Sequence, residues 1–337
     1  MKKNNSVVLF SLLIIFVMLA CNMPGITANQ NGDSVSATAT DVPVVSASAT
    51  PADVPTATVF VPSPEPTLEP ELPAPTLAVS HLLVPAAIVK PGRLINDVVS
   101  VDTAAEKRAP YGDSYKVNRF ERPFLQDMTY VADLDIVSFN LAYDEKFFYV
   151  SIELVGTDPN NDLGINYSVE LDTNADGFGD MIIIAYPPYN VEWSTSNVQI
   201  VQDTNRDTGG LSAEKSDAPL PGDGYDEVIF DGGHGIGADA DLAWARVNAG
   251  DKATVQFAFK KAWIGTRFMY GVVADGGLKS IADMDYVDRF TTEEAGSPVR
   301  DQKEYPLKAL YGVDNVCREV FGFTGTEQEP QRCLPTR

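Results

Sequence analysis

The chain has 337 residues, 44% of them apolar and 21% charged, which is enough to bury a sizeable core in one or two domains. Its 47 acidic residues outnumber its 25 basic residues and give a formal net charge of −22, which argues against nucleic acid and anionic lipid surfaces as partners and favours cations. The two histidines, His81 and His234, are too few for the common His-rich zinc sites and argue against a Ser-His-Asp hydrolase.

The first residues have the pattern of an export signal. Two lysines precede an apolar run at 7–20, which is shorter than the roughly 20 residues of a membrane-spanning helix. The run ends with the sequence MLAC, which resembles the lipobox of bacterial lipoproteins. This resemblance implies a signal peptide at 1–20, diacylation of Cys21, and a protein held at the outer face of the cell membrane by its lipid alone. The sequence ITA at 26–28 offers an ordinary signal-peptidase site as the alternative, and both interpretations imply export.

Residues 21–90 are rich in Ala, Thr, Ser, Val and Pro. Frequent proline and few large apolar residues prevent a packed core, so this stretch is predicted to be a disordered linker. As a flexible coil it spans about 45 Å, which suits a tether through a cell-wall layer. His81 falls within it and is interpreted as an incidental polar residue.

Residues 91–305 are predicted to form the folded domain. Apolar and polar residues alternate in many short segments that Gly- and Asp-rich connections separate, which is typical of strands with one buried face. The predicted strands are 137–143, 148–154, 165–171, 181–186, 197–201, 227–230, 254–260 and 267–274. The continuous apolar run in 181–186 predicts burial on both faces. The expected fold is all-β, an antiparallel β-sandwich of the jelly-roll or immunoglobulin-like kind with long loops.

Regular helix is expected at one place only. Thr291 and Glu294 have the spacing of a capping box, which predicts one short helix before Pro298.

The connection after the third predicted strand has the composition of a calcium loop. Oxygen-bearing side chains recur at every second residue, and a glycine follows the third of them. The expected ligands are Asp172, Asn174, Asp176, the backbone carbonyl of Phe178, and Asp180. The loop resembles those of EF-hands, dockerins and thrombospondin-type repeats, although Ile183 stands at the twelfth position, where an EF-hand has Glu. A structural calcium ion is therefore expected, and a solvated acidic turn is the alternative.

Two further connections are candidates for metal sites. Asp203, Asn205 and Asp207 repeat the alternating oxygen pattern, but Arg206 could neutralise this cluster, so they are the weaker candidates for calcium. The glycine-rich, acidic run 231–241 contains His234 and is interpreted as a mobile loop, with a ligand-facing or third metal loop as the alternative.

An aromatic connection follows the fourth predicted strand. Rings presented on a loop suit stacking against sugars, and neighbouring polar groups can bond the hydroxyls. The candidate ligand-binding residues are Tyr186, Tyr189, Asn190, Glu192 and Trp193. Aromatic residues beside prolines also cover the ends of sandwich cores, which is the alternative. Trp244 and Trp263, beside strand-like segments, are expected in the core.

Cys317 and Cys333 are expected to form a disulfide, because an exported protein folds in an oxidising compartment. The bridge would pin a C-terminal tail, 306–337, that lacks an obvious strand pattern.

The order of strands and turns also carries a resemblance. The strand start at 133–135, the turn 143–146 leading into 147–150, and the strand ending at Leu171 and Asp172 look like DOMON-like domains and family 9 carbohydrate-binding modules. Such domains bind sugars or haem, and several carry structural calcium. The haem ligands of those domains are Met and His. Because the expected folded region contains a single histidine, His234, with no clear partner ligand, haem is not expected here.

The sequence thus predicts a non-enzymatic, surface-tethered, calcium-stabilised module for an extracellular ligand, carbohydrate or a cell-wall component, without a nucleic-acid partner. No nucleophile elbow, metalloprotease helix or phosphate loop occurs in the sequence. Two alternatives stay open: a polysaccharide hydrolase with a carboxylate pair, and a structural envelope or adhesion protein without a small ligand.

Overall fold

A computed structural model describes residues 80–110, 119–209, 222–248, 252–284, 289–295, 308–326, 328–329 and 332–333. All of them belong to one compact unit, Pro73–Arg337. The predicted signal peptide 1–20, Cys21 and the linker up to residue 79 lie outside the described residues. In the described part of the chain, no helix is long and apolar enough to cross a membrane.

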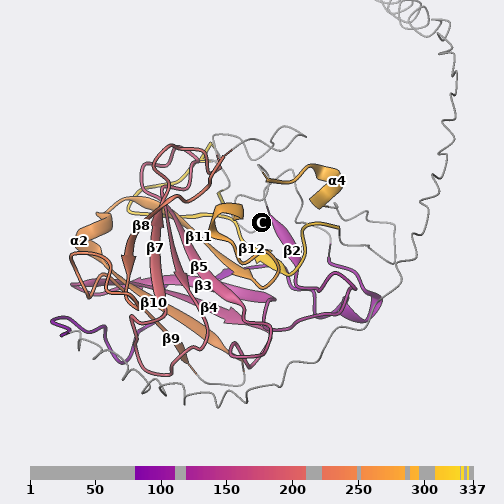
Figure 1. The fold of residues 1–337 in the computed structure, drawn as a ribbon, viewed down its shortest axis with the longest axis horizontal. Helices are drawn as coiled ribbons and strands as arrows, with labels where there is room; N and C mark the ends of the chain where they lie inside the picture. Colours follow the sequence, from indigo (N-terminus) through magenta and orange to yellow (C-terminus); the bar gives the residue numbers. More distant parts are fainter. Residues whose placement is uncertain are drawn as a thin grey trace, which may run out of the picture. The chain divides into compact units, whose positions relative to one another are not determined.

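The fold consists of two antiparallel sheets (Figure 1). The first, sheet A, has the order β1-β3-β4-β10-β9, formed by Ile95–Asn96, Ile136–Tyr143, Phe147–Leu154, Thr254–Lys260 and Ala243–Asn248. The second, sheet B, has the order β2-β12-β11-β5-β6-β7-β8, formed by Phe120–Arg122, Val313–Asn315, Phe268–Asp275, Asn166–Asp172, Met181–Ala185, Val198–Gln202 and Glu227–Asp231. An additional strand, β13 (Glu319–Phe321), pairs with β11. The prediction of an all-β antiparallel sandwich is confirmed, and all eight predicted strands are present.

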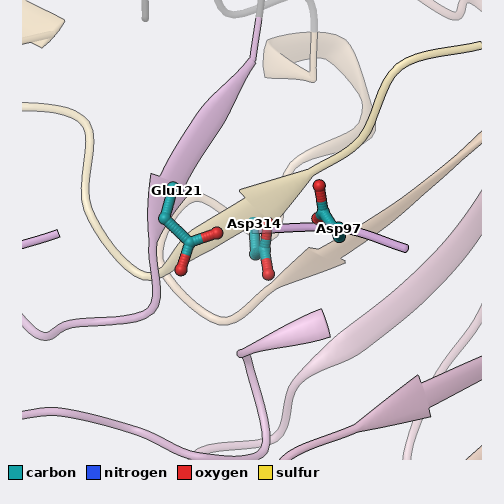
Figure 2. Close-up of side chains that lie close together, drawn as sticks. All are labelled: Asp97, Glu121 and Asp314. Carbon is teal, nitrogen blue, oxygen red and sulfur yellow. The ribbon is translucent and has the colours of Figure 1, made fainter. Parts of the chain in front are cut away.

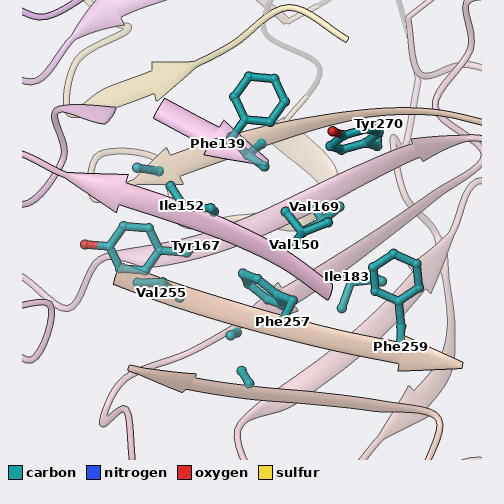
Figure 3. Close-up of a cluster of buried hydrophobic side chains, with 14 of the residues drawn as sticks. Phe139, Val150, Ile152, Tyr167, Val169, Ile183, Val255, Phe257, Phe259 and Tyr270 are labelled. Atoms are coloured by element: carbon teal, nitrogen blue, oxygen red, sulfur yellow. The ribbon is translucent and has the colours of Figure 1, made fainter. Parts of the chain in front are cut away.

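The core lies between the two sheets, where the inward side chains of both meet (Figure 3). In β4, Phe148, Val150 and Ile152 are fully buried, as the alternating pattern requires. From sheet B the inward residues include Tyr167, Val169, Ile183 and Tyr270. Burial of this apolar area is the main stabilising contribution to the fold.

Strand β6 is buried on both faces, as its continuous apolar run predicted. Ile183 faces the core between the sheets, whereas Ile182 and Ile184 belong to a second apolar cluster with Phe120 and Val313. This second cluster covers the opposite side of sheet B. Two apolar faces on one strand explain why its sequence does not alternate.

Within the residues that the structure describes, helical structure is confined to single turns. They are η1 (Ala104–Glu106), α2 (Lys261–Ile264), η3 (Ile281–Asp283) and α4 (Thr292–Ala295). The capping box is present at the last of them, where the Glu294 amide donates to Thr291 Oγ1 and the Thr291 amide donates to Glu294 Oε2. The α2 turn was not predicted, because four residues are too few to show a helical period.

The C-terminal segment is part of sheet B rather than a tail beside it. Strand β12 pairs with both β2 and β11, and β13 pairs with the other end of β11. The predicted disulfide between Cys317 and Cys333 is confirmed and lies directly after β12. These strands have three residues each, too few for a recognisable alternation.

Residues 80–90 lie against the outer face of sheet A, although their composition assigns them to the linker. The His81 ring packs against the Trp244 ring at a tilt of 53°, with 4.5 Å between centroids, and its Nδ1 lies 2.8 Å from Asp241 Oδ1. Farther along, the Ala86 amide donates to the Tyr149 hydroxyl at 2.9 Å. Trp244 is buried, as predicted, and Trp263 packs partly buried against the main core.

Candidate functional site

The predicted calcium loop joins β5 to β6 at one end of sheet B. Asp172, the last residue of β5, is fully buried, and its carboxylate accepts hydrogen bonds from the amides of Asp176 at 3.2 Å and Gly177 at 2.9 Å. Gly177 has φ +94°, a conformation that glycine adopts without strain. The sharp bend therefore occurs where the sequence places it.

Two arginines neutralise this loop. The buried Arg318 places Nη1 2.9 Å from the carbonyl oxygen of Gly177 and forms an ion pair with Glu170. Arg206 forms an ion pair with Asp176, and its guanidinium lies over the Phe178 ring, 4.8 Å from the centroid. Neither partner was inferred from the sequence for this loop.

The other expected ligands of the loop are engaged by backbone and hydroxyl groups. Asn174 Oδ1 accepts the Asp176 amide at 2.9 Å, and Asp180 Oδ2 accepts the Thr173 amide at 2.7 Å. Burial raises the pKa of Asp172, an effect that the guanidinium of Arg318 opposes. The loop is thus an arrangement of Asx turns in which the carboxylates are held by donors of the chain itself.

The second predicted loop has the same local geometry and lies directly beside the first. Asp203 accepts the Arg206 amide at 2.7 Å and the Thr208 amide at 2.9 Å. The Asp203 amide donates to the carbonyl oxygen of Asp180, and the Gly179 amide to that of Thr208. Sheet B therefore brings the two loops of similar sequence together as neighbours.

The remaining candidates of the second loop turn towards the chain just before β8. Asp207 accepts the amides of Asp223 at 2.9 Å and Gly224 at 3.1 Å. Asn205 Nδ2 donates to Asp223 Oδ1 at 2.7 Å. The side chains of Asp207 and Asn205 thus organise the connection from β7 to β8.

Of the aromatic connection, one ring belongs to the core. Tyr189 is buried, and its hydroxyl lies 2.8 Å from the carbonyl oxygens of both Ile165 and Ala185. Tyr186 is half-buried, and its hydroxyl donates to Gln199 Oε1 at 2.9 Å. The Tyr189 ring is accordingly not displayed to solvent, which agrees with the alternative that aromatics here cover the end of the core.

Trp193 lies elsewhere, at the outer face of sheet A. It is half-buried, its Nε1 donates to the carbonyl oxygen of Ala86 at 2.9 Å, and the Arg246 guanidinium lies 4.3 Å from its ring centroid. The Tyr149 ring is 6.0 Å away, centroid to centroid. The neighbouring candidates Asn190 and Glu192 are exposed. Trp193 is therefore held in place beside exposed polar groups.

The glycine-rich run 231–241 forms a tight loop after β8. Asp231 Oδ1 accepts the amides of Gly233 and His234 at 2.9 Å each, and the His234 side chain is 79% exposed. A pocket of about 190 Å³ lies here, and Phe230 and Ile236 are among its lining residues. The exposed His234 ring agrees with its interpretation as a loop residue.

Sequence reasoning missed a group of three carboxylates, of which Glu121 and Asp314 are buried and Asp97 is half-buried. Oxygens of Asp97, Glu121 and Asp314 all lie within 4.8 Å of one another, the one such trio of acidic, His or Cys side chains in the described part of the chain (Figure 2). Burial, together with the charges of Glu121 and Asp97, raises the pKa of Asp314 well above its usual range. No spacing signal could reveal a trio drawn from three distant segments.

The chain was also compared with known proteins. No protein-family model, no curated protein and no solved structure matches it. Functional conclusions therefore rest on the geometry of the described residues.

Proposed function

We propose that the protein is an exported, lipid-anchored, non-enzymatic surface module whose calcium-stabilised β-sandwich binds an extracellular carbohydrate. The observation that carries the carbohydrate assignment is the setting of Trp193. The indole ring is held by a hydrogen bond to Ala86 and by Arg246 over its face, so the part of the ring that stays exposed is preorganised, which lowers the entropic cost of binding. The exposed Asn190 and Glu192 supply hydrogen-bonding groups for hydroxyls beside it.

Calcium binding is supported by the loop that begins at Asp172. Its oxygen ligands have the alternation of known calcium loops, and Gly177 provides the bend that such loops need. Binding there requires Asp176 to exchange Arg206 for the ion. Because the Arg206 side chain is 59% exposed, it can turn into solvent at little cost.

The export assignment rests on the sequence at Cys21 and on the disulfide. A bridge between Cys317 and Cys333 is typical of proteins that fold outside the reducing cytosol. Lipid attachment at Cys21 is tested by mass spectrometry of the mature N-terminus.

The decisive experiment is a glycan array probed with the full chain, in calcium and in EDTA, followed by affinity measurements on any glycan found. The expected result is binding without release of reducing ends. Trp193→Ala should weaken it by roughly 30-fold, since truncating a Trp hot spot costs about 2 kcal/mol or more. Trp193→Phe, which keeps a ring, serves as the matched control and should retain part of the affinity.

Three results would count against the proposal. Reducing ends that accumulate with time would identify a hydrolase. No binding to any glycan on the array would favour a structural envelope or adhesion protein. Binding that Trp193→Ala leaves unchanged would move the ligand site away from this face.

A further inference from the structure

The carboxylate trio is assembled by the tertiary fold. Asp97 follows β1, Glu121 lies in β2, and Asp314 lies in β12, and Figure 2 shows Asp314 between the other two. Glu121 and Asp314 are directly opposite each other across the β2–β12 pair, so their side chains share one face. Like charges in directly opposed positions destabilise a sheet unless something between them compensates.

The need for a positive charge that balances these carboxylates is clearest at Asp314. The residue is fully buried, and its Oδ2 accepts the Ile136 amide at 2.6 Å. Its Oδ1 is also buried and receives no hydrogen bond from any residue that the structure describes. A buried carboxylate with one oxygen unpaired carries a large desolvation cost. The orphaned oxygen belongs to the residue at the centre of the trio.

A fourth carboxylate, Asp135, lies close enough to Asp314 to contribute to the raised pKa of that residue. Asp135, which directly precedes β3, is fully buried, and its Oδ2 accepts the Ser100 amide at 3.0 Å and the Tyr130 hydroxyl at 2.5 Å. Its Oδ1 likewise has no hydrogen-bond partner among the described residues. In the same part of the chain, no Lys or Arg side chain forms an ion pair with Asp135 or Asp314.

The spacing of the trio suits calcium. Ca²⁺ binds oxygen at about 2.3–2.6 Å, so two ligands of one ion lie at most roughly 5 Å apart. The oxygens of Asp97, Glu121 and Asp314 meet that limit in all three pairs. Carboxylate oxygens alone fit a hard cation better than Zn²⁺, which favours nitrogen and sulfur.

We propose that Asp97, Glu121 and Asp314 bind one structural Ca²⁺ ion, with Asp135 adding negative charge beside it. The ion joins the segment after β1 to the β2–β12 pair of sheet B. Because Asp314 also accepts the Ile136 amide of β3, the site lies where the two sheets meet. A cation here converts mutual repulsion of buried carboxylates into a link between the N-terminal and C-terminal parts of the domain.

This site is separate from the Asp172 loop. Along β11, Asp314 lies opposite Ala274 and Asp172 lies opposite Met269, so five residues separate the two positions. At about 3.4 Å per residue that is roughly 17 Å. The two calcium assignments can therefore fail independently.

The test uses the full chain purified in detergent, with Ca²⁺ alone as the probe. Calcium per chain is counted by elemental analysis after dialysis, and affinity is measured by calorimetry. Asp314→Asn keeps the shape of the side chain and an acceptor for Ile136 while removing the charge. This variant should bind one calcium ion fewer per chain, or bind that ion more than about tenfold more weakly. Tenfold is the lower end of the loss seen for hydrogen-bond partners of metal ligands. Glu145→Gln, an equal charge change in an exposed turn, should bind calcium like the natural chain.

Thermal melting separates a metal ligand from a merely structural group. In EDTA, Asp314→Asn should melt at a higher temperature than the natural chain, because it relieves repulsion, whereas in calcium the order should reverse. An unchanged calcium count and affinity for Asp314→Asn would overturn the proposal. If that variant fails to fold, Asp97→Asn, at a half-buried position, decides by the same criteria. Loss of calcium in Asp176→Ala but not in Asp314→Asn would support the Asp172 loop and reject this site.

Discussion

The guanidinium of Arg318 lies against the carboxylate of Asp172, with Nη1 3.4 Å from Oδ2 and both side chains buried. The two residues are 146 positions apart in the sequence. Arg318 follows Cys317 directly, so the disulfide fixes the backbone that carries this cation. The C-terminal segment thereby provides the positive charge beneath the β5–β6 loop.

Arg318→Ala should destabilise the domain by about 3–5 kcal/mol, because it leaves the buried carboxylate of Asp172 without its cation. Arg318→Lys should retain only part of the free energy of unfolding that Arg318→Ala loses. An ammonium cannot reach Glu170, Asp172 and the Gly177 carbonyl together as the planar guanidinium does. Urea unfolding of the full chain measures both. Arg93→Ala, which removes an arginine side chain that is 75% exposed, should cost less than about 1 kcal/mol. Equal effects at the two arginines would contradict the buried-pair account.

Calcium removal should lower the melting temperature of the natural chain. At ten times the dissociation constant one bound ion adds about 1.4 kcal/mol of stability. Asp176→Ala should lose the stabilisation that calcium gives at this loop. In EDTA the same variant should differ only slightly from the natural chain in stability, because its partner Arg206 is largely exposed. Asp172→Ala should be destabilising in both conditions, since it also removes one of the two carboxylates that pair with the buried Arg318. Melting curves that EDTA does not shift would refute calcium stabilisation.

The disulfide should contribute about 3 kcal/mol, the value of the chain-entropy model for a loop near 15 residues. Its sequence separation is 16, and the Cys333 amide donates to the carbonyl oxygen of Arg318 at 2.7 Å. The double variant Cys317→Ser/Cys333→Ser should therefore unfold at lower urea and should not respond to dithiothreitol. A natural chain whose urea midpoint is the same with and without reductant would show that the bridge adds no stability.

Acid should weaken the attachment of residues 80–90 to sheet A. Burial by itself raises the pKa of Asp241, but hydrogen bonds from the Leu83 amide, His81 and the Leu82 amide outweigh it, so the net shift is downward. A lowered folded-state pKa contributes stability above the ordinary value of 3.8, and this stability is lost as the pH falls below that value. Asp241→Asn should thus be less stable than the natural chain at pH 7, and the difference should shrink at pH 3. A difference that is the same at both pH values would argue against a role for the Asp241 charge.

Much of the fold follows from local sequence. In β3 and β4 the alternation of apolar and polar residues encodes which side chains enter the core, so both strands could be predicted. The bend at Gly177 and the capping box at Thr291 are also local, because the interacting groups lie within five residues of each other. The short strands β2, β12 and β13 had no such signal and became visible only through their pairing with longer strands.

The candidate sites were less accessible to sequence reasoning. Tyr189 and Trp193 are four residues apart, yet one ring enters the core and the other lies at the outer face of sheet A. The carboxylates of the Asp172 loop meet Arg318 and Arg206, which arrive from other parts of the chain. The cation that pairs with a loop carboxylate depends on the tertiary fold, so local sequence does not identify it.

The sequence by itself determined the all-β class, the long strands, the loop beginning at Asp172 and the choice of partners for the disulfide, because each depends on spacing or on residue type. Only the tertiary structure decided that Asp97, Glu121 and Asp314 lie within a few ångströms of one another. The order of strands in sheet B sets β2 beside β12, and that order is a property of the whole core rather than of any local pattern. The buried carboxylates are therefore visible only once the sheets are assembled.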